Sequence, residues 1–258
     1  ATINYDSTAE RMGENKTPLM VVLLQEIQRY NVLLDEIGKS LVDLQKGIKG
    51  FLVMSPSLEN IFDCMYEGRV PAPWLKAYPS LLSLGSWSRD LIHRVEHFNR
   101  WAATLTPPIA FWLSAFTFPT GFLTAVLQTS ARKEGKSIDL LVWDFTPQEQ
   151  AVVFPPEDGV YVRGMYLEGA SWHKKNQTLM EPSLMELFCP LPPIHFRPVE
   201  QTKQRPKGMY ECPVYYYPQR AGTQGREAFV VVVELRSGEH PSEFWIKRGT
   251  AILLSLSN

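Results

Sequence analysis

The feature that most constrains the fold is a run of apolar residues at helical spacing between Thr17 and Gly50. Thr17 is of a type that caps helix N-termini, and Pro18 has the fixed φ angle that suits the first helical position. Apolar residues then recur every three or four positions, which predicts one helix about 45 Å long, ending near Gly47 or Gly50. The residues on this seam are Met20, Leu23, Ile27, Tyr30, Leu34, Ile37, Leu41, Leu44 and Ile48.

Two uses are open for a helix of this length. It can be one core helix of an ordinary bundle, or it can also dock onto a neighbouring domain. The second use is open because the seam is longer than a short helical domain needs, and because other apolar residues lie off it. These residues are Val21, Val22, Leu24 and Val32.

Two further helices are predicted in the same half of the chain. Ser55 and Pro56 begin one that ends at Gly68, with Leu58, Ile61, Phe62 and Met65 on its apolar face. Another begins at Gly85 and Ser86, and its predicted core stripe is Trp87, Leu91, Val95, Phe98, Ala102 and Leu105.

The sequence changes character near Gly135, after which short β-prone runs and most of the prolines appear. The predicted fold class is therefore α+β, with a helical subdomain at 1–136 and a small antiparallel β-barrel at 137–258. The segment AFVVVV is apolar on both faces and is predicted to be a central strand. The predicted strands are 138–145, 150–154, 159–169, 194–199, 209–217, 228–236 and 251–257.

Composition excludes several classes of function. The 258 residues are 45% hydrophobic and carry a formal net charge of -1 with both signs interspersed, so neither nucleic acid nor an anionic membrane is expected as a partner. The uncharged stretch between Arg100 and Arg132 is interrupted by prolines and polar residues, which favours a buried core segment over a membrane span. The polar start without an initiating Met suggests a piece of a longer polypeptide.

Gly135-Lys136-Ser137 resembles the end of a phosphate-binding P-loop. Such a loop needs a glycine at position 130, after a strand, and Ser130 stands there instead. The preceding residues predict a helix starting at Pro119, with Gly135 as its left-handed C-cap. We therefore expect no nucleotide site and no cofactor.

His93-Arg94-Val95-Glu96-His97 has the spacing of an inverted zinc-protease motif. Both histidines share one helix face and Glu96 could act as a base, so a zinc metallopeptidase is the enzyme alternative. The helical wheel turns His93 and His97 away from the Leu91, Val95 and Phe98 stripe and towards solvent. We therefore expect no metal site and no enzyme activity in this protein.

The remaining candidates are weaker. His173, His195 and His240 have no Ser or Cys partner in a recognisable catalytic arrangement. Cys64, Cys189 and Cys212 are too few and too far apart for a disulfide framework, and the last two are predicted to be buried thiols. A β-module that binds a peptide or glycan through Tyr215-Tyr216-Tyr217 is a third possible class.

Several stretches together resemble the C-terminal domain of a dynein heavy chain, most closely the axonemal type of cilia and flagella. They are LLQEIQRYNVLLDEIGKSLVDLQKGIKG at 23–50, YPSLLSLGSWSRDL at 78–91, FWLSAFTFPTGFLTAVLQTSARK at 111–133, GVYVRGMYLEGASW at 159–172, CPVYYYPQR at 212–220 and the closing WIKRGTAILLSLS.

The resemblance implies a cytoskeletal module of an axonemal motor that packs on the AAA+ ring of its own heavy chain and tunes force and processivity. It also implies that ATP is hydrolysed by the ring, and that microtubules are reached only through the parent motor. The family places the long first helix between the ring and the rest of the domain. The polar residues expected to dock on the ring are Gln25, Arg29, Lys39, Asp43 and Lys46.

Overall fold

A computed structural model describes residues 2–76, 78–201, 207–216, 220 and 228–256. The chain divides into two compact units, the first containing Ala1–Lys16 and Met20–Thr106, the second Thr17–Leu19 and Pro107–Leu256. The predicted division at 136/137 was drawn from the change in secondary-structure type, whereas these units are defined by spatial proximity. It stays a prediction about subdomains.

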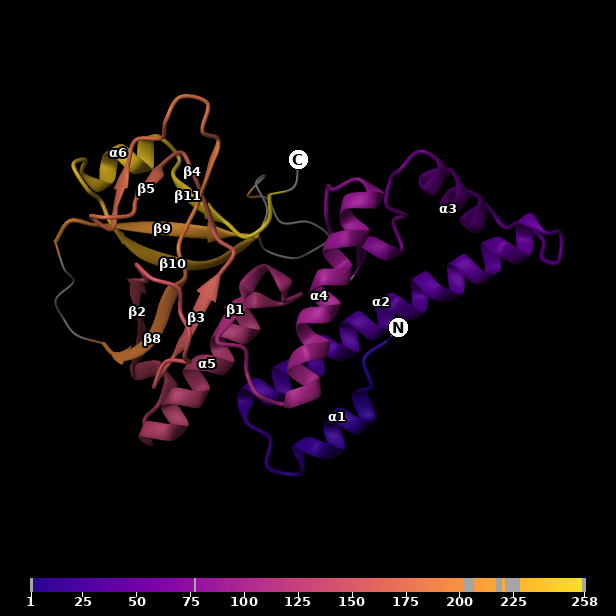
Figure 1. Ribbon diagram of the computed structural model, residues 1–258, viewed down its shortest axis with the longest axis horizontal. Coiled ribbons are helices and arrows are strands. Elements are labelled where there is room, and N and C mark those ends of the chain that lie inside the picture. The colour runs from indigo at the N-terminus through magenta and orange to yellow at the C-terminus, as the bar shows by residue number, and fades with distance from the viewer. Residues whose placement is uncertain (1, 77, 202–206, 217–219, 221–227, 257–258) are drawn as a thin grey trace. The chain divides into compact units, whose positions relative to one another are not determined.

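The first unit is helical, and its predicted helices are confirmed. Its helices are α1 (Tyr5–Met12), α2 (Pro18–Ile48), α3 (Pro56–Tyr66), a short 3-10 turn (Trp74–Lys76) and α4 (Leu84–Thr104) (Figure 1). Ser55 caps α3 by accepting a hydrogen bond from the amide of Leu58, as the Ser-Pro sequence predicts. Helix α1 was not predicted, because the N-terminal sequence is mostly polar. Asn4 caps it by accepting a hydrogen bond from the amide of Ser7.

Aromatic side chains form the core of the helical unit. Tyr30 of α2 packs on Phe98 of α4 with ring centroids 5.5 Å apart. Trp87 of α4 stacks between Trp74 and Tyr78, at 6.1 and 5.6 Å, and the indole of Trp74 donates to the hydroxyl of Ser40. These contacts join α2 to α4 through the segment that precedes α4.

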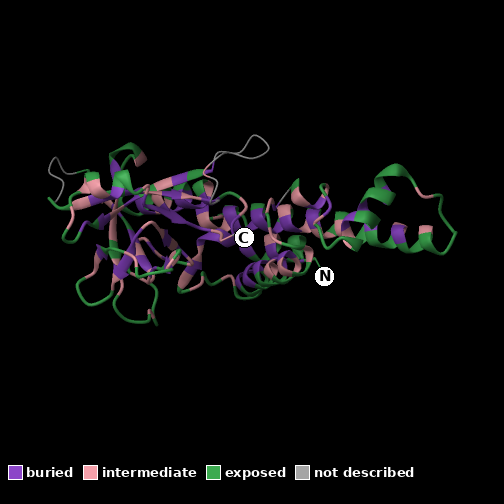
Figure 2. Ribbon diagram, turned by 90° about the horizontal axis from the view of Figure 1, so that it is seen from above, coloured by how far each residue is buried: buried purple, intermediate pink, exposed green. Residues whose placement is uncertain are grey.

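The two halves of α2 differ in burial. In the first half, seven residues between Val22 and Leu33 are buried, including Glu26, so more than one face of the helix is covered. In the second half only Ser40 and Leu44 are buried, and the predicted seam residues Leu41 and Ile48 are 39% and 65% exposed. Figure 2 shows the same change: α3 and the adjoining end of α2 are coloured mostly as exposed. Within this unit the predicted seam is therefore fully covered only along the first half of the helix, and which of the two uses applies to the second half stays open.

The second unit contains β1 (Ala110–Trp112), α5 (Pro119–Glu134), two 3-10 turns (Leu113–Ala115 and Ile138–Leu140) and a set of short strands (Figure 1). The strands are β2 (Leu141–Pro147), β3 (Val160–Arg163), β4 (Tyr166–Glu168), β5 (Ser171–His173), β6 (Thr178–Met180), β7 (Phe188–Pro190), β8 (Ile194–Glu200), β9 (Met209–Tyr215), β10 (Phe229–Arg236) and β11 (Ala251–Leu253). One further helix, α6 (Ser242–Lys247), was not predicted.

The strands form two open sheets and a hairpin, so the predicted closed antiparallel barrel is wrong. One sheet has the order β1-β3-β8-β2 and the other β10-β9-β11-β4-β7, while β5 pairs with β6. Both sheets are mixed, because β1 runs parallel to β3 and β11 runs parallel to β9. Within the described residues no hydrogen-bonded ladder joins one sheet to the other.

A single glycine explains part of this difference. Residues 159–169 were predicted as one strand, but the backbone bends at Gly164, whose φ of +79° suits glycine alone among common residues. A Cβ at this position would lie 2.6 Å from the Trp112 ring. The bend sends β3 into one sheet and β4 into the other.

Two strand predictions are also corrected. Residues 150–154 form no strand. The AFVVVV segment forms β10, which lies at the edge of its sheet, where Val230 and Val233 are buried while Phe229 and Val232 are 44% and 37% exposed. Within the described part of the protein, no helix is both long and apolar enough to cross a membrane.

Candidate functional site

A stripe of solvent-facing residues runs along α2. Its members are spaced by three and four positions, so they share one face of the helix. None of them is buried, and two are valines, Val21 at 40% and Val32 at 64% exposure. We call this set the α2 stripe; it consists of Val21, Gln25, Arg29, Val32, Glu36, Lys39, Asp43 and Lys46.

All five residues proposed for docking lie on the α2 stripe. Gln25, Lys39 and Lys46 are exposed, whereas Arg29 is partly buried because its guanidinium pairs at 2.9 Å with Glu26, whose side chain is 1% exposed. Asp43 and Lys46 face one another at 3.9 Å with both side chains about half exposed. The structure does not test whether these residues dock on anything.

The His93–His97 motif does not form an enclosed site. His93 is exposed, but His97 is 6% exposed and its ring meets Phe98 edge-on at 5.3 Å, so the prediction that His97 faces solvent is wrong. The two histidines therefore lie in different environments. Among the described residues, no group of three or more His, Cys, Asp or Glu is arranged to hold a metal.

His97 is buried because the inward-facing side of α4 includes Arg94. Its side chain is 2% exposed, and its Nε donates to Asp90 at 2.6 Å while the guanidinium lies 4.3 Å from the centre of the Tyr78 ring. The hydroxyl of Tyr78 donates to the same carboxylate. Because this charged residue turns inward, the buried face of α4 is rotated from Val95 towards Arg94, His97 and Trp101.

Ser130, Asp158 and His195 come together but do not form a catalytic triad. The Ser130 hydroxyl donates to the Asp158 carboxylate, whereas a ring nitrogen of His195 meets the backbone oxygen of Asp158 at 2.8 Å. A triad requires the histidine to lie between the other two side chains. Lys133 also donates to the backbone oxygen of Glu157 at 2.9 Å, so these contacts fasten the loop before β3 to α5.

The phosphate-loop alternative is excluded by the geometry of α5. The helix ends at Glu134, and Gly135 adopts φ 65° and ψ 30°, with its amide bonded to the carbonyl of Ala131. Arg132 and Lys133 occupy the last turn, where cations are favoured by the helix dipole. The predicted C-cap is confirmed, and its glycine serves the helix end.

The cysteines and tyrosines are mainly structural. All three cysteines are reduced and buried, which confirms the prediction for Cys189 and Cys212, and complete burial raises the pKa of the Cys212 thiol strongly. Tyr216 is buried and its hydroxyl donates to the carbonyl of Ser114 at 2.9 Å. Tyr215 lies half-buried at the end of β9, and Tyr217 lies outside the described residues.

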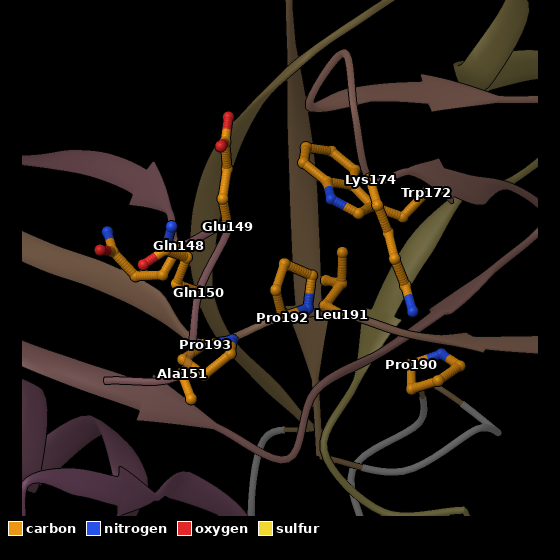
Figure 3. A pocket seen from close by; sticks show the side chains of 10 residues that line it. All are labelled: Gln148, Glu149, Gln150, Ala151, Trp172, Lys174, Pro190, Leu191, Pro192 and Pro193. Atoms are coloured by element: carbon orange, nitrogen blue, oxygen red, sulfur yellow. The ribbon is translucent and has the colours of Figure 1, made fainter. Parts of the chain in front are cut away.

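The second unit contains a pocket that sequence reasoning missed, with a volume of about 310 Å³. Two apolar side chains that line it, Trp172 of β5 and Leu191, are buried, at 5% and 8% exposure, and form its floor. Two backbone hydrogen bonds fix its walls, from Leu191 to Met165 at 2.9 Å and from Gln148 to Pro193 at 2.8 Å. Figure 3 shows all ten lining residues: Gln148, Glu149, Gln150, Ala151, Trp172, Lys174, Pro190, Leu191, Pro192 and Pro193.

The described residues thus present an exposed helical stripe and a small open pocket, and no arrangement of catalytic or metal-binding side chains was found among them. The family model that describes the C-terminal domain of the dynein heavy chain matches residues 1–254. The protein belongs to this family.

Three relatives show how far the similarity extends. Dynein axonemal heavy chain 2 of Homo sapiens is 55% identical over 99% of the sequence. The dynein-1-beta heavy chain, flagellar inner arm I1 complex, of Chlamydomonas reinhardtii is 49% identical over 98%. Dynein axonemal heavy chain 3 of Homo sapiens is 40% identical over 92%. The sequence spans about 6% of the length of each of these relatives.

Proposed function

We propose that this protein is a non-catalytic structural and regulatory module of an axonemal dynein heavy chain, located in the axoneme of a cilium or flagellum. In this proposal it packs on the AAA+ ring of the same heavy chain, where ATP is hydrolysed, and tunes force and processivity. Microtubules are reached only through the parent motor. Family membership and the names of the axonemal and flagellar relatives support this proposal.

The observation that carries the proposal is the α2 stripe. It extends from Val21 to Lys46, which is about 38 Å at 1.5 Å per residue. Two exposed valines lie among its polar residues, so a surface that covers the stripe would bury apolar as well as polar area. Burying the exposed two-thirds of Val32 against another surface would contribute about 1 to 2 kcal/mol.

A rigid helix in contact with two ring modules changes the free energy of each ring state in which their separation differs. A coupling of about 1 to 3 kcal/mol shifts the populations of such states roughly 5- to 150-fold. The free energy of burying Val32 is on this scale, so a contact that Val32 makes in one ring state and loses in another would shift their populations. The same mechanism alters mechanical output without adding a catalytic group.

The experiment is a pair of substitutions in the parent motor. Val32→Asp places a charge in the α2 stripe, and Val42→Asp makes the same change at a residue 50% exposed on the same helix but outside the stripe. Single-molecule trapping and a bulk ATPase assay are carried out on both motors. We expect Val32→Asp to change stall force or run length while ATP turnover persists, and Val42→Asp to resemble wild type. Identical stall force and run length in all three motors would contradict the proposal.

A further inference from the structure

The most exposed apolar side chains among the described residues of the second unit lie together in one tight turn before β7. Leu184 and Met185 are 95% and 93% exposed, and Leu187 is 73% exposed. Single exposed apolar residues are common on protein surfaces, but three within four positions, two of them almost wholly in water, need an explanation. We call residues 183–187 the Leu184 turn.

One carboxylate holds the Leu184 turn in shape. Oε2 of Glu186 accepts a hydrogen bond from the backbone amide of Ser183 at 3.0 Å, and the amide of Glu186 donates to the carbonyl of Ser183 at 3.0 Å. Oε1 of Glu186 accepts from the hydroxyl of Ser171, a residue of β5 that is 7% exposed, at 3.3 Å. The pKa of Glu186 is lowered, mainly by the Ser183 amide, so the carboxylate keeps these hydrogen bonds at neutral pH. The turn is therefore fastened to β5.

The backbone of the turn is strained at Met185. Its φ is +67°, a conformation that glycine or asparagine adopts far more readily than a residue with a long side chain. Such strain persists only where surrounding contacts enforce it, and it occurs frequently at sites that are shaped for binding. Here the hydrogen bonds of Glu186 enforce it, so Leu184 and Met185 are held in water in one backbone geometry. Part of the ordering that docking requires is thus complete in the folded protein.

We propose that Leu184 and Met185 form a docking anchor that inserts into an apolar pocket on another part of the same heavy chain. The inference rests on the proposed function for the identity of that chain, but it names a contact that is separate from the α2 stripe. Glu186 is the one ionisable residue of the turn, and its carboxylate is engaged within the protein. The surface that the turn offers is therefore apolar, and the thioether of Met185 adapts readily to the shape of an apolar pocket.

The size of the anchor indicates which molecule it contacts. Burial of two large apolar side chains by itself corresponds to a dissociation constant of about 1 mM. A separate protein present at about 1 μM would occupy such a contact only about once in a thousand. A pocket on the same polypeptide has an effective concentration of about 1 mM or more, so the contact is made for much of the time. The sequence spans about 6% of the length of its relatives, so a far larger part of a heavy chain is available to supply the pocket.

Met185 reports on its own docking, because a covered thioether is shielded from dilute hydrogen peroxide, which converts exposed methionine to the sulfoxide. Oxidation is measured by mass spectrometry on the purified parent heavy chain without other axonemal proteins. The internal reference is Met180, which ends β6 and is 38% exposed. An undocked Met185 should oxidise faster than Met180, since it is 93% exposed. We expect instead that Met185 oxidises no faster than Met180.

Leu184→Ser in the parent heavy chain should speed the oxidation of Met185 about threefold or more, because it removes half of the anchor and leaves the reporter. Leu184→Ile keeps an apolar side chain of the same size and should leave Met185 protected. Leu140→Ser is the matched control, since it makes the same change at a leucine of the second unit that is 54% exposed and lies outside the turn. Leu184 is 95% exposed, so circular dichroism of Leu184→Ser should match wild type.

Three results would overturn the inference. The first is a Met185 that oxidises faster than Met180 in the wild-type heavy chain. The second is protection of Met185 that Leu184→Ser does not relieve, or that Leu140→Ser relieves equally. The third is protection that is lost when the heavy chain is diluted from about 1 μM to about 1 nM, or that appears only when other axonemal proteins are added. In the third case the occupant would be a separate molecule.

Failure of the anchor and failure of the proposed function give different results. An unprotected Met185 in a motor whose stall force or run length responds to Val32→Asp would contradict the anchor alone. A protected Met185 that responds to Leu184→Ser, in a motor that is indifferent to Val32→Asp, would contradict the role of the α2 stripe and support the anchor.

Discussion

Removal of the Asp90 carboxylate is predicted to destabilise the helical unit more than removal of the Arg94 guanidinium that it binds. The two groups differ in burial, since the side chain of Arg94 is 2% exposed and that of Asp90 is 25% exposed. Asp90→Ala leaves a buried guanidinium that cannot lose its proton, and breaking a buried pair in this way costs about 3 to 5 kcal/mol.

Arg94→Met should cost less, at about 1 to 3 kcal/mol, because water reaches the carboxylate that remains. That carboxylate also still accepts the hydrogen bond from Tyr78. Methionine fills much of the space of the arginine stem, which limits the loss of packing. The double variant Asp90→Ala/Arg94→Met should be more stable than Asp90→Ala alone, since it leaves no unpaired charge.

Equilibrium unfolding in urea, followed by tryptophan fluorescence and far-UV circular dichroism, measures these differences. Glu96→Ala is the control, because this residue is exposed on the same helix and should change stability by less than about 0.5 kcal/mol. The reasoning is refuted if Asp90→Ala lies within about 1 kcal/mol of wild type, or if Arg94→Met is the more damaging change.

Three further predictions concern single residues. Gly135→Ala should destabilise the protein by about 1 kcal/mol, because the φ of Gly135 is +65°. Gly38→Ala, in the exposed middle of α2, should instead stabilise it by about 0.5 to 1 kcal/mol. Thermal unfolding compares the two variants, and stability changes of the same sign would contradict the argument. The pKa of Glu186 is lowered, mainly by a hydrogen bond from the backbone of Ser183, so its contribution to stability is present above the ordinary carboxyl pKa and is lost as the pH falls through the lowered value. Glu186→Gln should therefore reduce stability at pH 7, by less than about 1 kcal/mol because the site is only partly buried. In acid the variant should converge with wild type, and a stability difference that grows in acid would contradict this reasoning. Cys212 should resist an aromatic disulfide reagent at pH 8 until the protein unfolds, because the thiol is buried and burial raises its pKa. Mass spectrometry locates the labelled cysteine, and prompt labelling of Cys212 in the native protein would disprove this.

Helices were predictable wherever local signals agreed. Pro18, the Ser55-Pro56 pair and Gly135 each satisfy backbone requirements that belong to a helix end, and the structure places helix ends at all three. The resemblance to the C-terminal domain of dynein heavy chains was also visible in the sequence, and the family match confirms it. The docking role of the α2 stripe stays a prediction.

Other features depended on partners far away in the sequence. Arg94 looks like a surface residue because its ion-pair partner, Asp90, lies only four residues earlier on the same helix. Its burial becomes clear only when Tyr78, from the segment before α4, is seen to lie against the guanidinium. The AFVVVV segment looks central because it is apolar on both faces, but its position at a sheet edge follows from which strands pair. The pocket was missed because its floor combines Trp172 with residues from 190 to 193, which are separated in sequence.

The sequence by itself determined the family, the α+β composition and the positions of the main helices, because spacing, caps and glycine conformations act within a few residues. Only the tertiary structure decided that the β half is two open mixed sheets, that Glu26 and Arg94 are buried, and that residues 150–154 remain unpaired. The physical reason is that strand pairing and the covering of a helix face depend on segments distant in sequence, even though the ion-pair partners of Glu26 and Arg94 lie three and four residues away on their own helices.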